Sequence, residues 1–225
     1  MSILTLILGE SGTGKTSSLR NLDPAKALLI QAVPKPLPFR NKGWRVHTKE
    51  TPGNILRTDD ADKIVATLHK SSRPIIVIDD WQYILANEFM RRTAETGFQK
   101  FTDIGKSAWN ILGAGANCGD KRVYLLAHTD TADDGRVKVK TIGKLLDEKI
   151  CVEGLVTICL RTAVRDGNYY FSTRNSGNDT VKSPIGLFAD HFIDNDLAAV
   201  DSAIAAYYSD DPLTAEAGGP AAAAA

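Results

Sequence analysis

A glycine-rich segment near the N-terminus holds the residues with the clearest chemical meaning. Residues 9–16 read Gly-Glu-Ser-Gly-Thr-Gly-Lys-Thr and match the spacing G-x-x-x-x-G-K-[ST] at every position. Glycines at these positions allow successive backbone N–H groups to converge on phosphate oxygens, and Lys15 adds a positive charge for the β- and γ-phosphates. The alternative is a glycine-rich turn that binds nothing. The spacing predicts a phosphate-binding loop (P-loop) for ATP or a related nucleotide, formed by Gly9, Glu10, Ser11, Gly12, Thr13, Gly14, Lys15 and Thr16.

Two aspartates follow the most apolar run of the chain. Residues 75–78 read Ile-Ile-Val-Ile and lead directly into Asp79 and Asp80. Ligands bind at the carboxyl ends of strands in α/β sheets, so Asp79 is expected to hold Mg²⁺ together with the Thr16 hydroxyl. Asp80 is the candidate general base for an attacking water. Aspartate is also a good helix N-cap, and for Asp80 the capping and catalytic interpretations stay open.

A third polar strand end follows residues 123–127, where His128 and Thr129 come next. A polar residue at this position can sense the γ-phosphate or orient water, and we take His128 as the candidate catalytic residue. The alternative is a surface histidine without a role in the site.

These residues need strands and helices that bring them together. Apolar runs predict strands at 3–8, 27–33, 74–78, 122–127, 152–160 and 169–173, with a half-exposed strand at 136–141 and one near 44–47 in an otherwise loop-like stretch at 34–54. Helices are predicted at 15–22, 59–71, 81–93, 102–114 and 196–208. The alternation predicts an α/β fold with a mostly parallel twisted sheet flanked by helices. Residues 1–212 are expected to form one domain, followed by a disordered Ala/Gly-rich tail at 213–225.

Composition narrows the class of protein. Lys+Arg and Asp+Glu balance at 27 each, so net charge does not indicate a nucleic-acid partner. Three scattered cysteines fit free thiols in a reducing cytoplasm, and no apolar run is long enough to span a membrane. The histidines do not have zinc-site spacing.

The three motifs together resemble the ATPases with a RecA-like core. More narrowly, the chain is similar to phage-encoded AAA-type or RecA-like ATP-binding proteins of single-strand annealing and recombination. The segments that carry this likeness are 9–16, 75–80, 126–130, and 171–175 running on to 182–184. The resemblance implies a parallel sheet whose sensor strand lies between the P-loop strand and the strand ending at Asp79. It also implies Mg²⁺ and ATP bound at the interface of a homo-oligomer.

Two further cations are assigned by the same resemblance. By position, Lys182 is the best candidate to reach a neighbouring subunit's phosphates, and Arg174 is the second; each is otherwise a solvated surface cation. Many RecA-like proteins carry a catalytic Glu after the second strand, but residues 29–35 here read Leu-Ile-Gln-Ala-Val-Pro-Lys. The missing carboxylate moves the role of base to Asp80, or implies slow hydrolysis.

Two segments are candidates for a nucleic-acid surface. Basic residues at every second position of a strand lie on one face and can track a phosphate backbone, as in Arg136, Lys138 and Lys140, followed by Lys144 and Lys149. The second segment mixes cations and aromatics: Arg91, Arg92, Phe98, Lys100 and Phe101. The alternative is a solvated hairpin edge, where lysine blocks unwanted strand pairing.

The resulting expectation is a cytoplasmic ATPase in the host cell. Mg²⁺-dependent ATP hydrolysis would be coupled to binding or annealing of single-stranded DNA in phage recombination or replication, without a membrane partner. The alternatives are a nucleotide-gated assembly module with little turnover and a small-molecule or nucleotide kinase.

Overall fold

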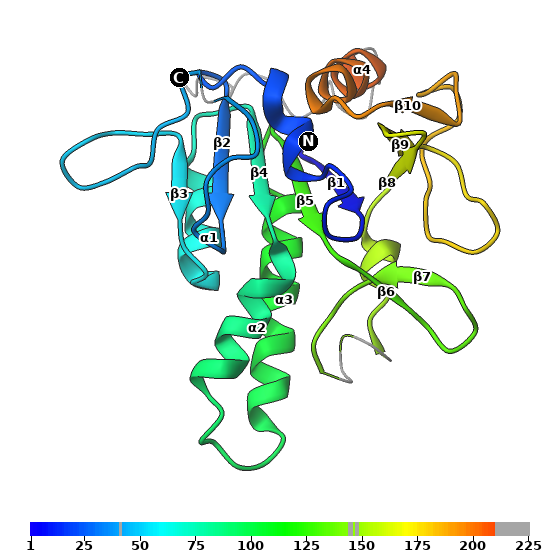
Figure 1. Ribbon diagram of the computed structural model, residues 1–225. Coiled ribbons are helices and arrows are strands. Elements are labelled where there is room, and N and C mark those ends of the chain that lie inside the picture. Colours follow the sequence, from blue (N-terminus) through cyan, green and yellow to red (C-terminus); the bar gives the residue numbers. More distant parts are fainter. Residues whose placement is uncertain (41, 144–145, 147–148, 210–225) are drawn as a thin grey trace, which may run out of the picture.

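The computed structural model describes residues 1–40, 42–143, 146 and 149–209 (Figure 1). Its central element is an eight-stranded sheet in the order β10-β9-β8-β1-β5-β4-β2-β3. The strands are β1 (Ile3–Leu8), β2 (Ala27–Gln31), β3 (Ile55–Arg57), β4 (Ile75–Asp79), β5 (Arg122–Ala127), β8 (Ile158–Arg165), β9 (Asn168–Ser172) and β10 (Phe192–Asp194). Every pairing from β8 to β3 is parallel, whereas β9 and β10 are antiparallel additions at one edge. The predicted α/β class with a mostly parallel sheet is confirmed.

Helices cover both faces of this sheet. α1 (Ala61–Lys70), α2 (Trp81–Arg91) and α3 (Gln99–Ala116) bury one face, with Leu6 and Leu8 of β1 among the residues beneath them. α4 (Leu197–Ser209) and the short 3₁₀ helix η1 (Thr16–Asn21) bury the other face, where Ile7 lies. Because both faces are covered, the inner strands are continuous apolar runs, which is why the sequence predicted them well.

The strand order places three predicted strand ends side by side. β5 lies between β1 and β4, with Leu8 paired to Ala127 and Ile78 to Leu125. The P-loop and His128 follow the carboxyl ends of β1 and β5, and Asp79 is the last residue of β4. This is the order that the resemblance implies.

Some predicted elements are wrong in type or extent. The expected helix at 15–22 is the 3₁₀ helix η1, and the expected strand at 152–160 is a 3₁₀ turn, η3 (Val152–Leu155), before β8 begins. Glu153 of this turn is buried, and its carboxylate accepts a 2.7 Å hydrogen bond from the backbone N–H of Val139. The strand expected near 44–47 is a single bridge from Val46 to Ile55.

Two projections leave the main body. α2 and α3 form a hairpin that extends beyond the carboxyl ends of β4 and β5 (Figure 1). The strand expected at 136–141 is the shorter β7 (Val137–Val139), which pairs with β6 (Thr129–Thr131) in a separate two-stranded sheet. The predicted tail at 213–225 and the candidate Lys144 lie outside the described residues. Within the described part of the chain, no helix combines the length and apolarity needed to cross a membrane.

Candidate functional site

The segment predicted to bind phosphate forms a tight loop between β1 and η1. Gly12 has a φ of 79° and Gly14 a φ of 98°, a backbone region that L side chains rarely adopt. Gly9 is required for a different reason, because a Cβ there would lie 1.8 Å from the hydroxyl oxygen of Thr162 on β8. Thr162 also lies within hydrogen-bond distance of Thr13, with 2.6 Å between their hydroxyl oxygens. The neighbouring strand therefore braces the loop.

Lys15 lies against its own loop. Its ammonium donates hydrogen bonds of 2.7 Å to the Gly9 carbonyl and 2.8 Å to the Glu10 carbonyl, and the residue is 6% exposed. Burial lowers the pKa of Lys15 to about 8, against the opposing charges of Asp80 and Asp79. The ammonium is thus held at the centre of the loop by two bonds that phosphate oxygens can replace.

Thr16 and Asp79 meet as predicted. The Thr16 hydroxyl lies 3.1 and 3.0 Å from the two carboxylate oxygens of Asp79, which is 1% exposed. Burial, reinforced by the charge of Asp80, raises the pKa of Asp79 to about 6. A buried carboxylate with this environment gains from a cation beside it, and oxygen ligands are those that Mg²⁺ prefers.

The environment of Asp80 distinguishes between the capping and catalytic interpretations. Asp80 occupies the N-cap position of α2 in a left-handed conformation (φ 60°, ψ 44°), but its side chain makes no capping hydrogen bond. Its buried carboxylate instead pairs with Lys35, and its other oxygen lies 3.6 Å from Nε2 of His128. The side-chain capping interpretation is wrong, and the carboxylate faces the polar residues of the site.

His128 lies beside Asp80, whereas Thr129 begins the β6–β7 hairpin. Burial, followed by the charge of Lys15, lowers the pKa of His128 below its usual range, so the ring is neutral at neutral pH. Its backbone is fixed on both sides: the N–H donates to Gln82 and the carbonyl accepts from Lys140. Of the two candidates at this strand end, His128 is the one that lines the site.

A cavity of about 280 Å³ opens over the P-loop. The sequence missed part of its lining, namely Ser17, Lys35, Pro36, Pro38 and Tyr169. Lys35 lies between two prolines, four residues after β2 ends at Gln31, and this position was the available signal. Tyr169 comes from β9, and no sequence pattern pointed to it. A larger cavity of about 600 Å³ lies between α1 and the segment 47–56 and contains none of the predicted site residues. The smaller cavity is the candidate site because predicted site residues line it, although its volume is smaller.

Lys182 and Arg174 lie away from this cavity. The backbone of Lys182 bridges to Cys159 on β8, and the Arg174 guanidinium donates to the carbonyl of Ala189. Neither residue lines the cavity of its own chain. Their assignment to a neighbouring subunit's phosphates stays a prediction.

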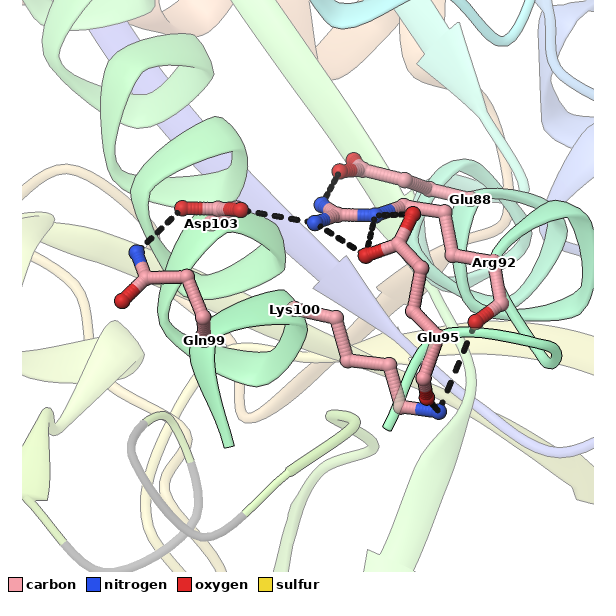
Figure 2. Close-up of polar contacts among 6 residues, drawn as sticks. All are labelled: Glu88, Arg92, Glu95, Gln99, Lys100 and Asp103. Atoms are coloured by element: carbon pink, nitrogen blue, oxygen red, sulfur yellow. Dashed lines mark hydrogen bonds and ion pairs between the residues drawn. The ribbon is translucent and has the colours of Figure 1, made fainter. Parts of the chain in front are cut away.

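The basic side chains of the α2–α3 hairpin form hydrogen bonds and ion pairs within the chain. Figure 2 shows Arg92 hydrogen-bonded to the carboxylates of Glu88, Glu95 and Asp103. The Lys100 ammonium donates to the backbone carbonyls of Arg92 and Glu95. Arg91 is paired with Asp59 at 2.6 Å. Of its aromatic residues, Phe98 is 88% exposed. The cations of this segment therefore have partners within the chain, and its role as a DNA surface stays a prediction.

The other basic segment is partly available. Arg136 and Lys140 are exposed on the β6–β7 hairpin, although Arg136 lies 3.3 Å from the carboxylate of Asp134. Lys138 is half-buried opposite Asp130 in the ladder, and Lys149 lines a neighbouring cavity with Arg136. Because Lys140 donates its backbone N–H to His128 at 2.8 Å, this hairpin is joined to the site.

The sequence matches no model of a known protein family, and no curated protein is significantly similar to it. The function has to be inferred from the residues that the fold brings together.

Proposed function

We propose that this protein is a Mg²⁺-dependent P-loop ATPase with a RecA-like core. The observation that carries the proposal is the meeting of Thr16 with Asp79, at 3.0 Å, beside a glycine loop that holds Lys15 at its centre. Backbone N–H groups, a lysine and a hydroxyl–carboxylate pair are the groups that bind and polarise a nucleoside triphosphate. The position of β5 between β1 and β4 supports the RecA-like assignment.

Thr16 and Asp79 are the residues that would hold Mg²⁺. Their oxygens lie close enough to face one ion, and the described residues contain no cluster of three or more His, Cys, Asp or Glu side chains that could hold a metal without further ligands. Mg²⁺ commonly takes one or two protein ligands and completes its shell with substrate phosphates and water. When bound, it neutralises charge on the β- and γ-phosphates.

The chain's own residues supply the remaining parts of hydrolysis. In the proposed reaction a water oxygen bonds to the γ-phosphorus while the bond to the β–γ bridging oxygen breaks, giving ADP and inorganic phosphate. Asp80 accepts the proton of that water, and the neutral His128 ring beside it orients the water. Lys15 stabilises the charge that develops on the leaving oxygen.

Coupling to single-stranded DNA is the biological part of the proposal. It rests on the resemblance to annealing and recombination ATPases, together with the hydrogen bond that joins Lys140 of the basic hairpin to His128. A change at His128 when nucleotide binds can reach the hairpin through this bond. Assembly into a homo-oligomer with ATP at the interface, in the host cytoplasm and without a membrane, belongs to the same proposal.

A nucleotide-gated assembly module is the second candidate. Gln31 pairs in register with Asp79, near the place where the catalytic Glu of many RecA-like proteins would follow. Its amide donates to the Lys35 carbonyl and so serves the loop rather than catalysis. This favours slow turnover.

Phosphate release from ATP, measured with and without single-stranded DNA, separates these functions. DNA-stimulated release supports the ATPase. An ATP-dependent change in the size of the protein without phosphate release supports the assembly module. A protein that neither binds ATP nor releases phosphate contradicts both candidate functions.

A further inference from the structure

Lys35 occupies an unexpected place in the site. It lies in the segment Pro-Lys-Pro-Leu-Pro at 34–38, and its ammonium forms an ion pair with Asp80. Prolines fix φ on both sides of the lysine, and the Gln31 amide donates a 3.2 Å hydrogen bond to its carbonyl. The backbone that carries Lys35 is therefore held in place over the cavity, which Lys35, Pro36 and Pro38 help to line.

The ammonium is shared between a buried partner and open space. The Asp80 side chain is 5% exposed, whereas that of Lys35 is 40% exposed. An ammonium has three donors, and one carboxylate oxygen uses one of them. Burial lowers the pKa of Lys35, but the hydrogen bond to Asp80 and the charges of Asp79 and Asp80 raise it by more. The net pKa is raised, so Lys35 stays charged.

Charge balance explains why a cation is needed here. Asp80 lines the cavity proposed to receive a triphosphate, and the carboxylate of the buried Asp79 accepts a hydrogen bond from Thr16, which also lines it. Like charges at this range repel strongly in a partly buried site. Mg²⁺ would offset the charge at Asp79. Asp80 has Lys35 as its ion-pair partner, and the charge of Lys15 also acts on it, whereas the neighbouring His128 is neutral.

We propose that Lys35 is a phosphate-binding residue that this chain supplies from its own proline-rich loop, where it neutralises Asp80 and donates to the terminal phosphate. The proposed reaction places Asp80 and His128 beside the water that attacks the γ-phosphorus. Lys35 pairs with Asp80, so its ammonium would lie at the γ-phosphate end. The contact then favours triphosphate over diphosphate. This inference rests on the proposed nucleotide site.

The proposal gives opposite effects for the two partners of the ion pair. Removing Lys35 deletes a hydrogen-bond donor to the phosphate and leaves the Asp80 carboxylate without its ion-pair partner, facing the nucleotide. Neutralising Asp80 leaves an unpaired ammonium there. A purely structural ion pair would not shift the preference between triphosphate and diphosphate in opposite directions.

The test is equilibrium binding of ADP and of the non-hydrolysable β,γ-imido analogue of ATP, both with Mg²⁺. The variants are Lys35→Ala and Asp80→Asn, since Asn tolerates the left-handed backbone of Asp80. Lys42→Ala, an exposed change in the same loop region, is the matched control. We expect Lys35→Ala to weaken binding of the imido analogue about tenfold and binding of ADP less than about twofold. We expect Asp80→Asn to tighten binding of the imido analogue, and Lys42→Ala to change the affinity for neither nucleotide.

An equal effect of Lys35→Ala on both nucleotides, or none on either, overturns the role of Lys35. If Lys35→Ala does not fold, Asp80→Asn decides: a raised preference for the triphosphate supports the proposal, and an unchanged or lowered one overturns it. Wild-type protein that binds neither nucleotide overturns the phosphate site itself. Wild-type binding with unchanged preferences in the variants overturns only the inference about Lys35.

Discussion

Thr16 and Asp79 are 63 positions apart, yet the Thr16 hydroxyl lies 3.0 Å from one carboxylate oxygen of Asp79 and 3.1 Å from the other. One residue ends the P-loop and the other ends β4. The intervening β5 positions the two strand ends so that a single cation can face both side chains. The predicted metal site depends on this relationship.

Thr16→Val tests that relationship with little change of shape. Valine keeps the branched side chain but removes the hydroxyl oxygen, so the gain in ATP affinity from adding Mg²⁺ should fall by at least about tenfold. Titrations of ATP with Mg²⁺ and with EDTA measure this gain. Thr67→Val on α1, whose hydroxyl donates to the Lys63 carbonyl of its own helix, should keep this gain. Equal gains in wild type and Thr16→Val would remove Thr16 from the metal site.

Asp79→Asn should change how stability depends on pH. Burial, then the charge of Asp80, raises the pKa of Asp79 to about 6 from an ordinary 3.8. Between these values the folded state binds more protons than the unfolded state, so this group's contribution to stability is present below about pH 4 and is lost as pH rises through about 6. Above that pH the buried charge costs on the order of 1–3 kcal/mol, which the variant avoids.

Urea unfolding at pH 5 and pH 7.5 measures this difference. The variant should gain stability relative to wild type at the higher pH while losing Mg²⁺-dependent ATP affinity. An identical loss of stability between the two pH values in both proteins would show that Asp79 is not the group responsible.

Gly14→Ala should destabilise the fold through the loop itself. Gly14 has a φ of 98°, and an added Cβ would meet the Tyr169 ring at 2.9 Å, so a loss of about 1–3 kcal/mol is expected in the free energy of unfolding. Gly113→Ala on the exposed side of α3 meets nothing within 4 Å and should instead gain about 0.5–1 kcal/mol. Denaturant titration compares the two, and equal effects would contradict the conformation assigned to the P-loop.

Lys140→Ala tests the DNA part of the proposal. If exposed Lys140 contacts a single-stranded phosphate, its loss should weaken binding of oligonucleotides of any sequence and reduce the slope of log K against log salt by about 0.7. Fluorescence anisotropy at several salt concentrations gives the slope. Lys106→Ala on the exposed face of α3 is the charge-matched control. An unchanged slope for Lys140→Ala would place any DNA contact elsewhere.

The part of the site that the sequence predicted is the part encoded locally. Gly9 to Thr16 match one motif, Asp79 ends a buried strand and His128 follows another, so their positions at the edge of the sheet follow from parallel pairing. Lys35 and Thr162 could not be placed, because their contacts depend on how the loop after β2 turns toward β4 and on which strand pairs with β1. The role of Asp80 depended on a left-handed backbone conformation that no residue pattern specifies.

The fold shows the same division. Four inner strands buried on both faces, β1, β2, β4 and β5, were predicted within a few residues. The inner strand β8 was placed too early, at 152–160 instead of Ile158–Arg165. The edge strands β3 and β10, each three residues long, were missed. Short edge strands bury too few side chains to leave a pattern, and their pairing partners set their extent.

The most direct test of the central claim is the affinity of wild-type protein and Lys15→Ala for ATP with Mg²⁺, measured by calorimetry on proteins shown to be folded. Lys15 makes its two hydrogen bonds at the centre of the P-loop, so its removal should weaken ATP binding by at least about thirtyfold, or ~2 kcal/mol. Wild-type binding that is lost in Lys15→Ala is the predicted result. Equal affinity in the two proteins, or no binding by wild type, would contradict the assignment of the phosphate site.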